Sequence, residues 1–153
     1  MTVSVFAPCP GRVLPLSETP DPVFATEMMG PGVTIDPDPD SGEVTVVSPI
    51  AGKVMVVHPH AFVVMGAGGV AVLVHLGIDT VRLKGAGFEL LTEKGATVSA
   101  GDPMVRWDPA AIAEQGMSTM VPVVAMERQK GSVPRPAAGA VAVVGEVLFT
   151  VTP

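Results

Sequence analysis

Residues 70–81 read Val-Ala-Val-Leu-Val-His-Leu-Gly-Ile-Asp-Thr-Val, an apolar run that ends in a histidine and is followed by a glycine and an aspartate. Valine-rich runs closed by a turn residue are typical of β-strands. We therefore expect a strand over 70–75. Side chains alternate along a strand, so Leu73 and His75 should share one face. Gly77 permits a turn directly afterwards.

The same pattern extends outward on both sides of this run. Apolar runs bounded by Gly or Pro predict strands at 1–6, 12–16, 33–35, 44–48, 53–58, 61–65, 98–107, 120–126 and 141–151, with shorter ones at 81–83 and 89–91. Because Gly101-Asp102-Pro103 interrupts 98–107, that segment predicts a hairpin. The segments 7–13 and 48–54 resemble each other, each with a proline, a glycine, a basic residue and a valine.

Only two segments favour helix. Asp108–Gln115 has a capping aspartate, Pro109 at the first helical position and a closing Gly116. A single helical turn is expected over 25–29, after the stiff Pro20-Asp21-Pro22 turn. The sequence therefore predicts one all-β domain over residues 1–153, an antiparallel β-sandwich or barrel with a duplicated, hybrid-type topology and one or two short helices.

Composition excludes several classes of protein. The 153 residues are 48% hydrophobic, so a disordered chain is excluded, and the net charge of −6 comes without the basic stripe that nucleic-acid binding requires. One cysteine, Cys9, excludes an internal disulfide and a cysteine zinc site. No apolar stretch approaches the roughly 20 residues of a membrane span, and no secretory leader is recognisable. We expect a soluble, cytoplasmic protein.

All three histidines lie between residues 58 and 75. Even-numbered positions would place Val56, His58, His60 and Phe62 on one side of a continuous strand. A hairpin through the glycine-rich turn at 66–69 would then bring His60 opposite His75, so that two imidazoles face each other on an apolar patch.

Two kinds of chemistry suit such a pair. A neutral imidazole can attack a phosphoryl group without a separate base, and a second imidazole can hydrogen-bond the phosphoryl oxygens. Alternatively, His58-Pro59-His60 forms an H-x-H pair that could ligate zinc. Asp79 would either orient an imidazole or cap a turn. The cluster of Phe24, Met28 and Met29 is expected to supply one core residue and an exposed apolar patch.

The segment 72–81 resembles the H-[FL]-G-I-D-T-V signature of the glucose-type enzyme IIA of the bacterial phosphoenolpyruvate-dependent sugar phosphotransferase system. His60-Ala61-Phe62 resembles the motif around its second histidine. Further segments resemble the family in the same order, at 20–24, 48–52, 83–88 and 119–124. The resemblance covers nearly the whole chain.

This resemblance implies a β-sandwich in which His75 accepts phosphate from phospho-HPr and passes it to a cysteine of the sugar permease's IIB domain. His60 would hydrogen-bond the phosphoryl group without carrying it. The resemblance implies an apolar docking rim composed of Val23, Phe24, Met28, Met29, Val56, Leu73 and Val81. Asp21 and Asp79 would meet arginine on HPr.

Further expectations come from the same resemblance. No cofactor is required, although His60 and His75 could share a zinc ion with the carboxylate of a partner. The protein would be cytoplasmic, reaching the inner face of the membrane through the permease, and it could bind regulated transporters or kinases. Glucose and N-acetylglucosamine both fit as the sugar. Where the family often has a threonine that hydrogen-bonds an imidazole, this chain has His58, which either orients a ring or faces solvent.

Three alternatives compete with this interpretation. A zinc hydrolase would use His58 and His60, but the lysostaphin-like peptidases need a further histidine upstream, and none precedes His58. A lipoyl or biotinyl carrier needs a lysine at a hairpin tip, a setting that Lys53 and Lys84 lack. A non-catalytic regulatory binding module could coexist with phosphotransfer.

Overall fold

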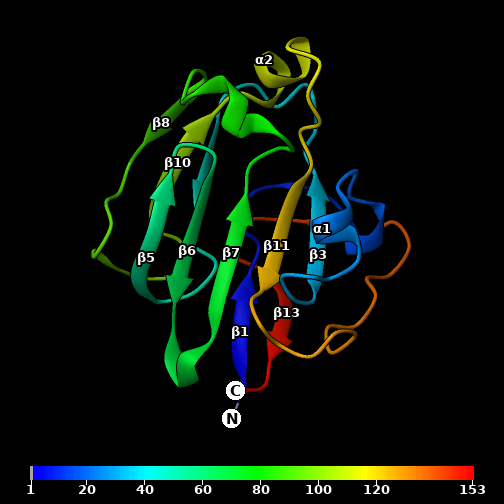
Figure 1. Cartoon of the computed structure of the whole chain (residues 1–153), viewed down its shortest axis with the longest axis vertical. Coiled ribbons are helices and arrows are strands. Elements are labelled where there is room, and N and C mark those ends of the chain that lie inside the picture. Colours follow the sequence, from blue (N-terminus) through cyan, green and yellow to red (C-terminus); the bar gives the residue numbers. More distant parts are fainter. Residues whose placement is uncertain (1) are drawn as a thin grey trace.

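In the computed structural model, which describes residues 2–153, one curled antiparallel sheet contains eight strands in the order β12-β2-β3-β11-β7-β6-β5-β9 (Figure 1). The strands are β2 (Gly11–Pro15), β3 (Gly32–Asp36), β5 (Gly52–His58), β6 (Ala61–Met65), β7 (Ala71–His75), β9 (Thr97–Val98), β11 (Val121–Ala125) and β12 (Val141–Ala142). The all-β prediction is therefore confirmed.

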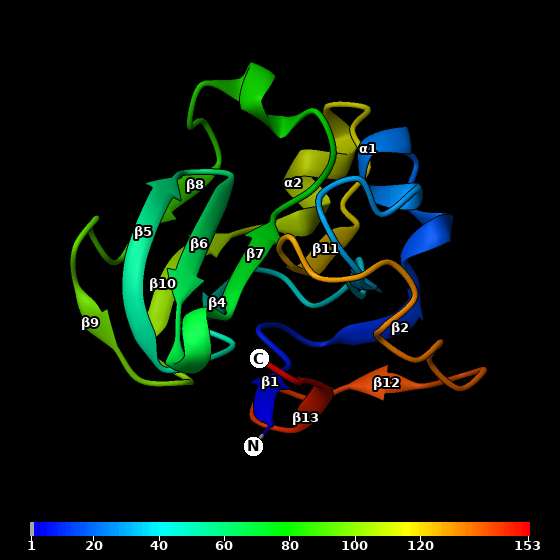
Figure 2. The same cartoon turned by 60° about the horizontal axis from the view of Figure 1, so that its bottom comes forward.

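Two smaller units complete the β-structure. A three-stranded sheet has the order β4-β10-β8, made of β4 (Val44–Val47), β8 (Phe88–Leu90) and β10 (Pro103–Trp107). β1 (Val3–Phe6) pairs with β13 (Val147–Val151), and the first and last strands thus lie side by side (Figure 2). The helices are α1 (Pro22–Ala25) and α2 (Pro109–Glu114). Within residues 2–153, no helix is long and apolar enough to cross a membrane.

Alternation along the central strands divides their side chains between two apolar clusters. Phe62 and Val64 of β6 and Val72 and Val74 of β7 point inward, and they join Trp107 in the main core. The side chains that alternate with these point to the outer face of the large sheet, where they contribute to a second, smaller cluster. Its buried members are Leu16, Phe24, Ala61, Leu73, Ile78 and Val124. α1 supplies Phe24 to this cluster. β11 is buried throughout, whereas the outer face of β6 and β7 is apolar and only partly covered, with Val63 half-buried and Met65 exposed.

Both helices begin where a capping aspartate stands. The Asp108 carboxylate accepts a hydrogen bond from the backbone N–H of Ala110 at 3.0 Å, which confirms the predicted start of α2. The Asp21 carboxylate accepts from the N–H of Val23 at 2.8 Å. Because this cap sets the first turn at Pro22, α1 lies at 22–25 rather than at the predicted 25–29.

The predicted strand at 81–83 is wrong. Thr80–Leu83 forms a 3₁₀ turn instead, flanked by Asp79 and Lys84 with φ of +62° and +52°. Left-handed backbone at both ends prevents an extended run between them.

The predicted hairpin over 98–107 is also wrong, because β9 pairs with β5 whereas β10 pairs with β4 and β8. The turn between them changes sheets. Its backbone is held by Ser48, whose N–H donates to the Asp102 carbonyl and whose carbonyl accepts from Gly101, both at 2.9 Å. A further turn at Gly145, with φ of +90°, divides the predicted strand at 141–151 into β12 and β13.

The two similar proline turns lie next to each other. The N–H of Phe6 donates to the Pro49 carbonyl and the N–H of Val47 donates to the Pro8 carbonyl, each at 2.9 Å. This reciprocal pair of hydrogen bonds joins the beginning of the chain to its middle and gives the repeated segments a common structural setting.

Gly52 provides a test of how tightly β5 and β6 pack. A Cβ at this position would collide with the carbonyl oxygen of Met65, which is backbone and cannot turn away. We expect Gly52→Ala to lower the free energy of unfolding by at least about 2 kcal/mol, measured by urea denaturation. Gly42→Ala, in open space at φ of +70°, should cost only about 1 kcal/mol. Equal losses for the two variants would contradict the close approach.

Candidate functional site

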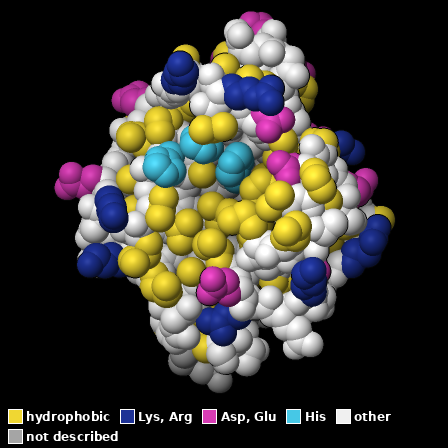
Figure 3. Space-filling model, viewed as in Figure 1, with side chains coloured by type: hydrophobic (Ala, Val, Ile, Leu, Met, Phe, Trp, Pro, Cys, Tyr) yellow, Lys and Arg dark blue, Asp and Glu magenta, His cyan; other side chains and the backbone are white. Residues whose placement is uncertain are grey.

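The three histidine side chains gather on one face of the molecule, beside a broad apolar surface (Figure 3). His58 ends β5, His60 lies in the two-residue turn before β6, and His75 ends β7. The ring centroids of His60 and His75 are 5.2 Å apart and nearly perpendicular, at 73°. The structure thus brings together the two imidazoles that the sequence placed on facing strands.

Their strand register differs from the expectation. Ala61, not His60, lies opposite His75, and Phe62 is fully buried in the core. His60 is free of the β6 alternation because Pro59 and His60 form the turn. A bulge between Val54 and Val56 shifts the parity of β5, so that His58 ends the strand on the exposed side. Strict alternation from 54 to 62 was therefore wrong.

A short hydrogen bond fixes the His75 ring. Its Nδ1 lies 2.6 Å from the carbonyl oxygen of Gly77. Because a carbonyl can only accept, Nδ1 must carry the proton, and in the neutral ring the lone pair of Nε2 remains free. The neutral tautomer therefore presents a nucleophilic nitrogen at Nε2.

The carbonyl that selects this tautomer is itself held by its neighbours. The N–H of Gly77 donates to Met120 at 3.1 Å, and buried Thr80 donates its hydroxyl to the Leu76 carbonyl at 2.7 Å. Gly77 has φ of +78°, and a Cβ there would lie 2.6 Å from the Thr80 methyl group. Only glycine fits this position without displacing the turn.

Burial is the main influence on both pKa values. It lowers the pKa of half-buried His75 below the ordinary 6.5, opposed by the Gly77 hydrogen bond and by the negative charges of Asp21 and Asp79. Burial also lowers the pKa of His60, and the neighbouring His75 and His58 add to the effect. Both rings are accordingly neutral at pH 7.

The two aspartates reach His75 from different elements. Asp21 is occupied as the cap of α1, whereas exposed Asp79 stands at the start of the 3₁₀ turn with no capping hydrogen bond from its side chain. Both lie close enough to influence the pKa of His75. The Asp79 side chain thus does not cap the turn, and its negative charge raises the pKa of His75.

The residues expected to form a docking rim divide into an exposed and a buried group. Met28 is 69% exposed, Val81 59%, and Val23 and Val56 40% each. Phe24 and Leu73 are buried in the outer cluster, and Met29 is partly buried against it. Phe24 is thus the core residue that the cluster of Phe24, Met28 and Met29 was expected to supply, and neither Phe24 nor Leu73 forms part of the exposed rim. Phe24 instead packs its ring 5.2 Å from that of His75 and walls off one side of it.

Metal ligation finds little support in this geometry. Among residues 2–153, no group of three or more His, Cys, Asp or Glu side chains is arranged to hold a metal ion. His58 and His60 stack with their rings almost parallel, at 11° and 5.7 Å. A zinc ion at His60 and His75 would need its remaining ligands from another molecule.

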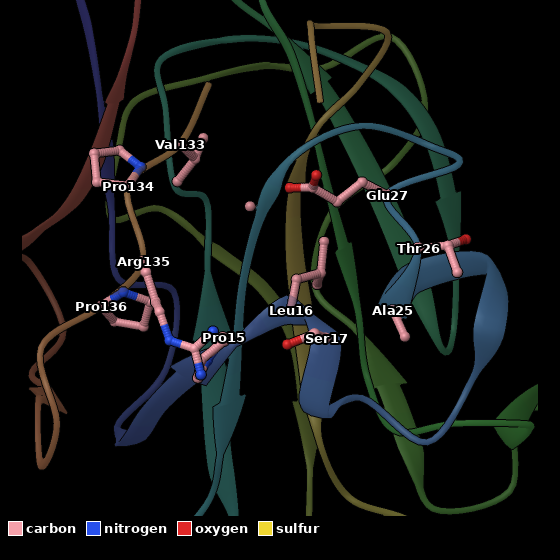
Figure 4. Close-up of a pocket in the computed structure, with 11 residues that line it drawn as sticks. Pro15, Leu16, Ser17, Ala25, Thr26, Glu27, Val133, Pro134, Arg135 and Pro136 are labelled. Atoms are coloured by element: carbon pink, nitrogen blue, oxygen red, sulfur yellow. The ribbon is translucent and has the colours of Figure 1, made fainter. Parts of the chain in front are cut away.

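A hollow of about 250 Å³ lies beside α1, and no sequence pattern predicted it (Figure 4). Glu27 and Arg135 line it from different segments, and the Glu27 carboxylate accepts a hydrogen bond from the N–H of Gly131 at 3.0 Å. Its walls contain no histidine. The histidines lie instead on an open face, which suits contact with another protein better than enclosure of a small molecule.

The tautomer and pKa of His75 can be measured directly. We expect long-range ¹H–¹⁵N spectra to show a protonated Nδ1 and a titration midpoint below 6.5, because burial disfavours the charged ring. The neutral, nucleophilic form should therefore predominate at pH 6.5. Gly77→Ala should shift the His75 resonances by displacing the acceptor. A protonated Nε2 in the neutral wild-type ring would contradict the assignment.

Comparison with known proteins agrees with this geometry. Residues 3–131 match the family described as phosphoenolpyruvate-dependent sugar phosphotransferase system, EIIA 1. The glucose-specific EIIA component of Staphylococcus epidermidis is 43% identical over 124 residues, which are 80% of this chain and 72% of that protein. The corresponding Oceanobacillus iheyensis protein is 40% identical, over 80% of this chain and 73% of its own.

A solved structure extends the similarity to the fold. Glucose permease IIA from Mycoplasma capricolum superposes with a TM-score of 0.85 at 32% identity, over 98% of this chain and 96% of that one. With the matched residues running through all three histidines, the chain belongs to the EIIA 1 family of the phosphoenolpyruvate-dependent sugar phosphotransferase system.

Proposed function

We propose that this component of the sugar phosphotransferase system carries phosphate on Nε2 of His75, accepting it from phospho-HPr and passing it to a IIB cysteine during sugar uptake. The observation that carries this proposal is the hydrogen bond from Nδ1 of His75 to the Gly77 carbonyl, which leaves Nε2 as the free nucleophile. Residues 1–153 would act together as a single IIA domain.

The transfer requires no general base. The Nε2 lone pair attacks the phosphorus atom as the bond from phosphorus to the HPr nitrogen breaks, so one P–N bond replaces another. A IIB thiolate then attacks the same phosphorus. An S–P bond forms as the P–N bond breaks, and its electron pair returns to Nε2, so His75 is again neutral with the proton still on Nδ1. No cofactor takes part in either step.

His60 is suited to stabilise the transferred group. A neutral imidazole has one N–H to donate, and the His60 ring lies 5.2 Å from that of His75. Donation to a phosphoryl oxygen would offset negative charge during transfer. The apolar surroundings, including Phe24, strengthen such a bond by keeping water away.

Partner docking would use the exposed rim around the histidines. Val23, Met28, Val56 and Val81 supply apolar contact, and Asp21 and Asp79 would meet arginine side chains of HPr. Transfer to IIB would bring the protein from the cytoplasm to the inner face of the membrane. Regulatory binding to transporters or kinases would use the same face, with zinc joining His60 and His75 only where the partner adds a carboxylate.

The carrier role can be tested with phosphoenolpyruvate, enzyme I and HPr. Wild type should gain one phosphate, read by intact mass at alkaline pH where phosphohistidine survives. His75→Ala should gain none, because the nucleophile is absent. His60→Gln should accept phosphate but pass it to IIB more slowly, by about 10- to 1000-fold, because the glutamine amide does not place its N–H where the imidazole N–H lies. Phosphate on His75→Ala, or none on wild type, would disprove the assignment.

The docking role of the rim calls for a separate experiment. Met28→Asp should weaken HPr binding and raise the KM for phospho-HPr, because a carboxylate interrupts the apolar rim without disturbing the core. Leu90→Asp is the matched control, since Leu90 is 44% exposed on β8, in the three-stranded sheet rather than in the large sheet that carries the histidines. Similar KM values for the two variants would exclude Met28 from the interface.

A further inference from the structure

The backbone of His60 is fixed, but its ring is not held by a hydrogen bond. The His60 carbonyl accepts from the N–H of Leu76 at 2.7 Å. Among the described residues, 2–153, its ring nitrogens have no hydrogen-bond partner within the chain. The direction of the His60 N–H must therefore be set by packing. The aromatic rings in contact with His60 are those of His58 and His75.

These neighbours contact His60 differently. The His75 ring meets it edge-on, at 73°, whereas His58 stacks against it with a centroid separation of 5.7 Å and an angle of 11°. Within residues 2–153, no aromatic contact joins His58 directly to His75. Any influence of His58 on the phosphoryl acceptor through ring packing must therefore pass through His60.

His58 is itself well placed to act as a fixed surface. It is the last residue of β5 and lies opposite Ala61 in the register of the hairpin. Pro59 follows it, with a restricted φ, and packs near Gly85, where a Cβ would lie 3.3 Å from the Pro59 ring. The sheet on one side and this turn on the other limit the movement of the His58 backbone.

We propose that His58 is a positioning residue for phosphoryl transfer: its stacked ring holds the His60 imidazole in the orientation that donates to the phosphoryl group on His75. This inference rests on the proposed carrier function. It depends on the flat aromatic surface of His58 rather than on its nitrogen atoms. A phenyl ring at position 58 should therefore serve as well, whereas alanine should not.

The test compares His58→Ala and His58→Phe in the rate of transfer from phosphorylated His75 to the IIB domain. An aromatic pair is worth enough to change orientation populations by about two- to tenfold, so we expect His58→Ala to slow transfer by that factor. His58→Phe should restore at least half of the wild-type rate. Lys53→Ala, an exposed change on the same strand, should leave the rate unchanged.

A double-mutant cycle shows whether the effect passes through His60. In a His60→Gln background, His58→Ala should cause no further loss, because there is no imidazole left to orient. Equal losses in both backgrounds would overturn the proposal and favour direct contact of His58 with a partner. Failure of His58→Phe to rescue would also overturn it.

Nuclear magnetic resonance gives a second measurement that does not depend on transfer. His58→Ala should weaken the nuclear Overhauser contacts between the rings of His60 and His75, and His58→Phe should preserve them. Unchanged contacts in His58→Ala would contradict the positioning role. If wild type accepts no phosphate at all, the carrier function fails and the role in transfer fails with it. If wild type transfers normally and the cycle is additive, only the role of His58 fails.

Discussion

The hydrogen bond between His75 and the Gly77 carbonyl is the constraint on which the site depends. It selects one tautomer, restrains the ring through Nδ1, and leaves the lone pair of Nε2 free. It exists because the chain turns back immediately after β7, with Gly77 at φ of +78° and Thr80 closing the turn onto Leu76. The tautomer of the proposed nucleophile is thus set by a backbone carbonyl.

The fold supports this turn through the division of apolar side chains between two faces. Inward residues of β6 and β7 build the main core, which makes the central strands rigid. Outward residues form the smaller cluster that receives Phe24 from α1. Because the outer face of β6 and β7 is only partly covered, the same strands that stabilise the protein also present an apolar surface beside the histidines (Figure 3).

Sequence patterns were sufficient for the fold class, and the hairpin through the glycine-rich turn was sufficient for the proximity of His60 and His75, although His60 lies in the turn before β6. They failed where residues with left-handed backbone conformations, a β-bulge or contacts between distant segments determine the local structure. Asp79 and Lys84 replace the expected strand at 81–83 with a 3₁₀ turn. The bulge at Val54–Val56 and the turn at Pro59 change which side chains share a face of the sheet. A pattern of alternating residues predicts neither the bulge nor the turn. Which of Phe24, Met28 and Met29 is buried depends on how α1 packs against the sheet, and no short sequence pattern specifies that packing.

The pairing of β1 with β13 has a consequence for how the protein forms. Val3 lies opposite Val151, so hydrogen bonds in this pair join residues from nearly opposite parts of the sequence. Closing the long loop between the two strands costs the chain conformational entropy before their hydrogen bonds can compensate for it. We therefore expect β1 and β13 to pair late in folding. During synthesis, β1 must wait for residues 147–151 to leave the ribosome, and until then its edge is open to other chains. A strand of only four residues keeps that exposed edge short.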